Sequence, residues 1–274
     1  MSGPNYFKVL LTFARNSLVR DMTFRANFVI DCVSSLSWVL MNLGFYVLIF
    51  EYTGEIGAQT GWHKYEFFIF LCTTLFVNSL VQTFFMPNAN EFSELIRTGN
   101  LDFALLKPID TQFVISFERI EWSSLANFVF AGGLLVYALG QLDYRPPLLQ
   151  CLLYPLYLGC GLAILYSLMI VLSSMSVWLG RNQSLYDFWF YITNFSRYPM
   201  EIYRGPIGTP LRLAFTFVVP ILVVVNVPAR LLAKPLDPDN WWLAGFALLA
   251  TAASLLASRA IFKRALASYR SASS

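Results

Sequence analysis

The chain contains repeated apolar runs, each long enough to cross a lipid bilayer. The clearest are residues 28–50, 66–86, 122–142, 148–179 and 241–262. Only 13% of the residues are charged, whereas a typical soluble domain has about 25%. A run of about 20 apolar residues predicts a membrane-spanning helix, and a helix satisfies its own backbone hydrogen bonds inside lipid. The sequence therefore predicts an all-α polytopic membrane protein.

The first run is preceded by an amphipathic segment, residues 5–27. Apolar and aromatic residues alternate there with Lys8, Arg15, Arg20 and Arg25. A helix of this composition lies in the membrane interface, with its basic groups toward anionic headgroups. The alternative is an ordinary amphipathic extension packed against the protein.

The fourth run, residues 148–179, is too long for one straight span of about 20 residues. Pro155 predicts a kink in its helix, or the helix extends beyond the bilayer. Gly159 and Gly161 predict a place where another helix approaches closely, because glycine has no side chain to keep it away.

Residues 185–232 admit two alternatives because prolines interrupt their apolar pattern. In the first alternative, 211–232 is the fifth span and 185–198 lies along the cytoplasmic face. In the second, 185–198 is a short fifth span, and the following Pro-rich stretch is a re-entrant hairpin in the outer leaflet. Both alternatives give six spans and place the two termini on the same side. The whole chain, 1–274, is then one transmembrane domain.

The distribution of basic residues predicts which side is cytoplasmic. Lys and Arg are enriched in the cytoplasmic loops of membrane proteins. With the amino terminus inside, most of the 19 Lys and Arg residues fall inside in either alternative. We therefore expect both termini in the cytoplasm.

One long polar insertion, residues 87–121, separates the second and third runs. It carries six acidic and three basic residues, and we expect Pro87 to end the second span. Residues 91–98 predict a short helix with Phe92, Leu95 and Ile96 on one side, and Gly99 is a typical helix end. An apolar ridge follows, made of Leu101, Phe103, Leu105 and Leu106. Apolar groups rimmed by charge predict docking on a partner; the alternative is a loop folded back on its own helices.

The sequence contains none of the motifs of the common enzymes. It has no phosphate-binding G-x-x-x-x-G-K-[ST] loop, no G-x-S-x-G and no H-E-x-x-H. The four cysteines show no C-x-x-C spacing, and His63 is the single histidine. We expect no metal, no cofactor and no nucleic-acid partner for this chain. The spans hold almost no ionisable residues of the kind that ion-coupled transporters use, so energy for transport would come from another protein.

Two segments resemble a known family. Residues 94–139 (ELIRTGNLDFALLKPIDTQFVISFERIEWSSLANFVFAGGLLVYAL) resemble the signature region of the ABC-2 export permeases, especially the stand-alone bacterial ones. Residues 196–232 (SRYPMEIYRGPIGTPLRLAFTFVVPILVVVNVPARLL) resemble the stretch before the last helix of that family, where a re-entrant hairpin carries a proline and ends near an arginine. The residues at these places are Pro199, Pro206, Pro210, Pro220, Pro228 and Arg230.

The resemblance implies an exporter subunit without its own nucleotide-binding domain. ATP and Mg would bind a separate ATP-binding-cassette subunit, and a second copy or a paralogous permease would complete the path in the bacterial inner membrane. The resemblance implies a coupling element between spans two and three, with these residues: Glu91, Phe92, Glu94, Leu95, Ile96, Arg97, Gly99, Leu101, Phe103, Leu106, Lys107 and Pro108.

The aromatic content of the spans, with little charge, predicts a lipid-like or amphipathic cargo, or a polymer that stacks on aromatic rings. The alternative functions are an ion-coupled secondary transporter and a non-transporting membrane anchor of a soluble complex.

Overall fold

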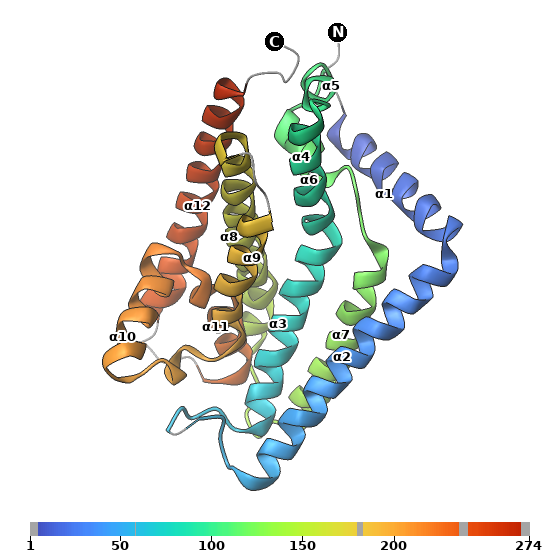
Figure 1. Ribbon diagram of the computed structural model, residues 1–274. Coiled ribbons are helices and arrows are strands. Elements are labelled where there is room, and N and C mark those ends of the chain that lie inside the picture. Colours follow the sequence, from blue (N-terminus) through green and yellow to red (C-terminus); the bar gives the residue numbers. More distant parts are fainter. Residues whose placement is uncertain (1–4, 58, 180–182, 236–240, 270–274) are drawn as a thin grey trace.

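The computed structural model describes residues 5–57, 59–179, 183–235 and 241–269, and the regular elements in these ranges are all helices. Five stretches are long and apolar enough to span a membrane: Arg25–Tyr52, Lys64–Thr98, Trp122–Gly140, Leu148–Leu179 and Trp241–Ser268. In Figure 1 these helices run side by side, with both termini at the same end. The all-α polytopic prediction is confirmed.

The amino-terminal segment is a helix, α1 (Tyr6–Thr23), as expected. The Asn5 side chain accepts a hydrogen bond from the Lys8 amide (3.2 Å) and so caps its first turn. Figure 1 shows α1 slanting away from the bundle before the chain turns at Phe24 into α2 (Arg25–Tyr52). Phe7 and Leu11 are exposed along α1, which suits a helix at a membrane surface. Its place in the interface stays a prediction.

Helical structure continues past Pro87, so this proline does not end the helix of the second span as expected. One residue separates α3 (Lys64–Phe84) from α4 (Met86–Thr98), and the two together form one 35-residue helical stretch whose apolar part is long enough to span a membrane. Pro87 lies in the first turn of α4, where its missing N–H costs no helical hydrogen bond within α4. The polar insertion therefore begins as a helical continuation of the span.

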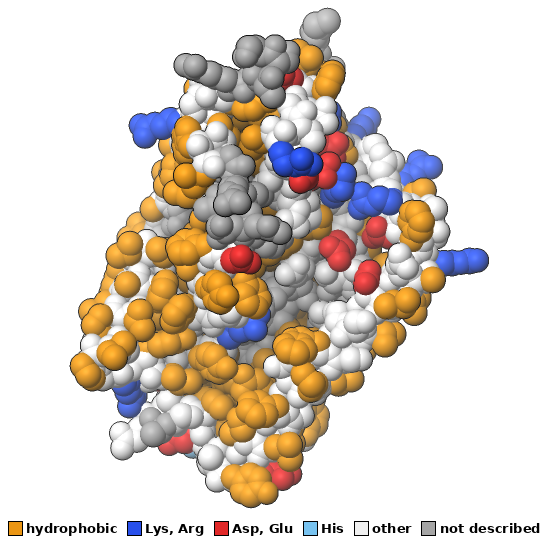
Figure 2. Space-filling view, in the orientation of Figure 1, with side chains coloured by type: hydrophobic (Ala, Val, Ile, Leu, Met, Phe, Trp, Pro, Cys, Tyr) orange, Lys and Arg blue, Asp and Glu red, His pale blue; other side chains and the backbone are white. Residues whose placement is uncertain are grey.

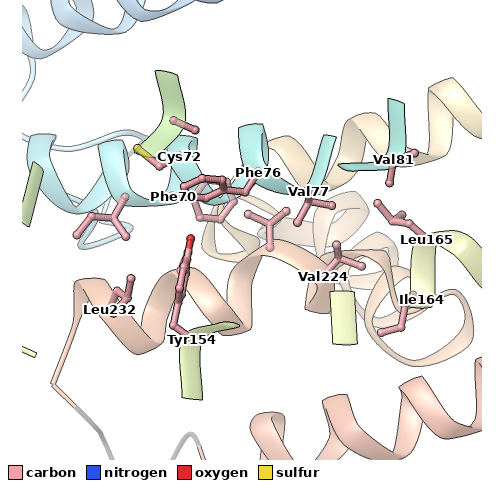
Figure 3. Packing of buried hydrophobic residues seen from close by; sticks show 14 of the residues in the cluster. Phe70, Cys72, Phe76, Val77, Val81, Tyr154, Ile164, Leu165, Val224 and Leu232 are labelled. Carbon is pink, nitrogen blue, oxygen red and sulfur yellow. The ribbon is translucent and has the colours of Figure 1, made fainter. Parts of the chain in front are cut away.

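The core lies where α3, α8 (Leu148–Leu179) and α11 (Ile221–Ala233) meet. Nearly every residue of α11 is buried. Figure 3 shows Val77 and Val81 of α3, Val224 of α11 and Leu165 of α8 converging in this region. The Tyr154 hydroxyl lies 3.1 Å from the Thr73 hydroxyl, which gives the buried phenol a partner. Helix α7 (Leu125–Gly140) packs on α3, and α12 (Trp241–Ser268) packs on α8.

The proline-rich stretch is broken, so residues 211–232 do not form one straight helix. Helix α10 (Gly205–Leu213) and the single π turn η4 (Ala214–Val218) form one arm, and α11 forms the other; the two arms meet at 88°. Pro220 stands at the bend, immediately before α11. Such a pair is either a broken span or a re-entrant hairpin.

The other candidate for a fifth span, residues 185–198, falls in α9 (Gln183–Asn194) and the 3₁₀ turn η2 (Phe195–Arg197). Twelve helical residues reach about 18 Å, less than the ~30 Å hydrocarbon core. A second turn, η3 (Met200–Ile202), then leads to α10. The bent pair fits the hairpin of the second alternative, but α9 is shorter than a full span, so both alternatives stay predictions.

Candidate coupling site at the polar insertion

The polar insertion folds as three helices joined by short turns: α4, α5 (Leu101–Leu105) and α6 (Thr111–Phe117), followed by η1 (Trp122–Ser124). Figure 1 places α4, α5 and α6 at the end of the bundle that carries both termini. In Figure 2, acidic and basic side chains gather toward this end, whereas hydrophobic side chains cover most of the rest of this face.

Pro87 helps to attach the returning chain to the second span. In a continuous helix the amide of residue 87 would donate to the Thr83 carbonyl, but proline has no N–H. The Glu121 amide donates to this carbonyl instead (2.9 Å). The two ends of the insertion are thereby joined by a hydrogen bond that the proline makes available.

Asn88 makes the second attachment, one residue further on. It is almost fully buried, and its amide nitrogen lies 2.6 Å from the Arg119 carbonyl and 3.1 Å from the Ser116 carbonyl. Its side-chain oxygen accepts from the Arg119 amide (2.8 Å). One side chain on α4 therefore lies within hydrogen-bond distance of three backbone groups of the chain that leads to the third span.

We expect Asn88→Ala to loosen this junction. The substitution removes the partner of the buried Ser116 carbonyl and of the part-buried Arg119 backbone groups, and a buried group left unsatisfied costs about 1–3 kcal/mol. The melting temperature of the purified chain should fall, and limited proteolysis should cut near 116–121. Asn100→Ala is the matched control, because Asn100 is exposed and its side chain caps no helix. Equal stability of the two variants would contradict the assigned role of Asn88.

Helix α1 contacts the same junction from the other side. The Ser17 hydroxyl accepts from the Ile120 amide (3.0 Å), and the Asp21 carboxylate accepts from the Trp122 amide (3.3 Å). The Trp122 indole N–H donates to the Ala14 carbonyl (3.3 Å). The first helix is therefore connected to the start of the third span.

The inner face of the insertion packs against the spans. Phe92 and Leu101 are fully buried, in a cluster with Ile170 of α8 and Phe262 of α12. The Phe92 and Phe262 rings lie 5.9 Å apart. These contacts pack α4 and α5 directly against two long helices, α8 and α12.

A polar network anchors α6 to the last helix. Asp110 caps α6 by accepting from the Phe113 amide (3.2 Å), and it forms an ion pair with Arg259 of α12. The Arg259 guanidinium also donates to the Gln112 side chain (2.7 Å), whose amide reaches the Tyr166 hydroxyl (3.0 Å). The hydrogen bonds from Arg259 hold the pKa of Asp110 below its ordinary value, so this carboxylate stays charged near neutral pH.

The outer face carries exposed apolar side chains. Phe103 is 70% exposed and Leu106 is 80% exposed. Beside them, Lys107 pairs with Glu118 (3.1 Å), and Arg97 pairs with Glu94 (2.7 Å). Gly99 ends α4 in the left-handed conformation (φ 73°), which glycine adopts without strain.

The predicted coupling residues thus divide between two faces. Phe92 and Leu101 are buried, and Leu95 and Ile96 are partly buried against the same cluster, so these residues fold back on the chain's own helices. The side chains that remain available on the surface are those of Glu94, Arg97, Phe103, Leu106, Lys107 and Pro108. Glu91 pairs with Arg119 (2.8 Å) and so contributes to the junction. The coupling role of the whole set stays a prediction.

Three of the five prolines predicted for the hairpin stand at breaks or helix starts. Pro199 precedes η3, Pro206 lies in the first turn of α10, and Pro220 precedes α11. Pro210 and Pro228 lie inside their helices.

The predicted Arg230 belongs to a cluster at the opposite end from the termini. It pairs with Glu201 of η3 (3.2 Å), which also accepts from the indole N–H of the fully buried Trp62 (2.9 Å). The Lys234 ammonium lies 4.5 Å from the Trp62 ring centroid. Sequence reasoning missed Trp62, Glu201 and Lys234 as partners of the hairpin, because 139 residues separate the first two.

The comparison with protein families agrees with this arrangement. A family model described as "ABC-2 family transporter protein" matches residues 36–273. A search of curated proteins finds none that matches this chain. The matched region contains the polar insertion, the bent pair and the five candidate spans apart from the first residues of α2. The chain therefore belongs to the ABC-2 family of transporter proteins, the membrane permeases of ABC transporters.

Proposed function

We propose that this chain is the transmembrane subunit of an ATP-driven exporter and that its polar insertion docks on a separate ATP-binding-cassette subunit. The observation that carries the proposal is the exposed apolar pair Phe103 and Leu106, held on a base that is buried against α8 and α12. An exposed apolar pair rimmed by ion pairs is the composition expected of a protein interface. ATP and Mg belong to the partner, and this chain supplies the membrane path.

The rigid attachment of the insertion suggests how the partner's motion is used. Closure of the ATPase subunits pushes on α4 and α5, and the Phe92 contact and the Arg259–Asp110 pair transmit the push to α8 and α12. A second copy of this chain, or a paralogous permease, provides the other wall of the path. The chain then lies in a bacterial inner membrane, and the end with the termini faces the cytoplasm, as the distribution of basic residues predicts.

Site-directed photo-crosslinking tests the docking. A benzophenone amino acid replaces Leu106 in the full chain, which is expressed together with the ATPase subunit, and the control position is Tyr52. Tyr52 is 88% exposed but lies at the end of α2, far from the insertion. We expect a crosslinked product with the ATPase subunit from position 106 and none from position 52. Equal crosslinking from both positions, or none from 106 in a complex that co-purifies, would contradict docking at this face.

A further inference from the structure

Arg197 is an exposed cation at a depth where its surroundings are apolar. The next residue, Tyr198, lies beside Tyr46 of α2. Tyr46 in turn contacts the Phe67 ring of α3 (4.8 Å between centroids). Tyr46 lies four residues before Phe50, the last residue of the first apolar run, which is about 6 Å along a helix. Arg197 is therefore near the Phe50 end of the apolar part of α2.

The charge of Arg197 has no acidic partner in the part of the chain that the structure describes. Its guanidinium carbon lies 5.6 Å from the centroid of the Phe190 ring. By contrast, Arg230 and Arg259 are each paired with a carboxylate. Arginine stays protonated at any physiological pH, and an ionisable side chain within an apolar layer often marks a functional position. Within the described residues the guanidinium is therefore available to bind an anionic ligand.

The surface around Arg197 is aromatic. One face of α9 is buried through Trp189 and Ile192, while the other exposes Phe190 and Tyr191, and Tyr198 follows beyond η2. Figure 2 shows that hydrophobic side chains cover much of the face on which α9 lies, with a basic group set among them. Rings of this kind supply apolar contact and cation–π attraction next to the guanidinium.

We propose that Arg197 and the exposed aromatic face of α9 bind an anionic amphiphile, a molecule with a carboxylate or phosphate head and an apolar tail. The guanidinium matches either head with two parallel N–H···O bonds, and the exposed rings contact the tail. The occupant is cargo on its way through the permease, so this inference rests on the proposed transport function. Charge complementarity decides the class of ligand. The site offers a cation and an apolar surface, which suit an anionic amphiphile and repel a cationic one.

Ligand binding by the purified full chain in neutral detergent tests the proposal. The probe is a fluorescent dodecanoate, and its uncharged methyl ester reports apolar contact alone. We expect Arg197→Gln to weaken dodecanoate binding by about tenfold or more, the size of a lost charge-assisted contact, and to leave binding of the ester unchanged. Arg197→Lys should restore part of the affinity. Arg204→Gln is the matched control, because Arg204 is also exposed and follows in the same segment.

Each outcome has one meaning. Unchanged dodecanoate affinity in Arg197→Gln, or an equal loss for acid and ester, overturns the proposal. A change in oligomeric state with unchanged binding assigns Arg197 to a carboxylate of a second copy and also overturns it. Competition by decyl phosphate, but not by phosphatidylglycerol, is the result expected for a cargo site; displacement by phosphatidylglycerol alone identifies the occupant as bilayer lipid and overturns the cargo assignment. The assay contains no ATPase subunit, so a failure of coupling leaves its result intact.

Discussion

A double variant, Phe103→Asp with Leu106→Asp, is expected to lose the ATPase subunit while it keeps its fold. The two side chains are 70% and 80% exposed, so aspartate at these positions changes the free energy of folding of the permease little. At a docking interface the same change places two charges in a desolvated apolar patch, and such central apolar groups each contribute about 2 kcal/mol or more to binding. Binding should fall below detection in a pull-down, and permease-dependent ATP hydrolysis should disappear.

Two further variants separate docking from folding. Phe103→Leu with Leu106→Met keeps the surface apolar and should retain the complex. Phe92→Ala empties a buried position between α4 and α12, which costs about 3–5 kcal/mol of stability, so its melting temperature should fall clearly. If the aspartate double variant still binds the ATPase subunit with normal affinity, the outer face of the insertion is not the docking surface.

The second large effect is expected at Gly161, where α8 meets α11. A methyl group added to Gly161 would lie 2.5 Å from the Val224 carbonyl oxygen and 3.0 Å from a Val224 methyl carbon. Pro228 has no N–H to donate to this carbonyl four residues earlier, so the oxygen projects from α11 toward the glycine without a helical partner. Gly161→Ala therefore forces the two helices apart, and overpacking of this kind costs about 1–3 kcal/mol.

Gly159 provides the matched control in the same helix. A methyl group there meets no atom within 4 Å, and alanine is the better helix former by about 1 kcal/mol. We expect Gly161→Ala to lower the melting temperature and transport activity, and Gly159→Ala to leave both unchanged or slightly improved. Thermal unfolding followed by fluorescence-detected size exclusion measures the difference. Equal behaviour of the two variants would show that α11 does not depend on this close approach.

The sequence by itself determined the class of the fold and the position of most spans. Apolar length predicts helices across lipid without reference to any other part of the chain, and α2, α7, α8 and α12 lie where the runs predicted them. The end of α4 at Gly99 was also predictable from neighbouring residues, because the left-handed backbone conformation at a helix end favours glycine. These features depend on residues that are neighbours along the chain.

Only the tertiary structure decided which apolar residues are available. Phe92 and Phe103 look alike in the sequence, but Phe92 is buried because Phe262, 170 positions later, lies against it. In the same way Gly161 is a contact and Gly159 is not, since Val224 approaches one of them. Burial depends on partners that are distant in the chain, and periodicity carries no record of them. The polar insertion is therefore a predictable element whose inner and outer faces could be assigned only in three dimensions.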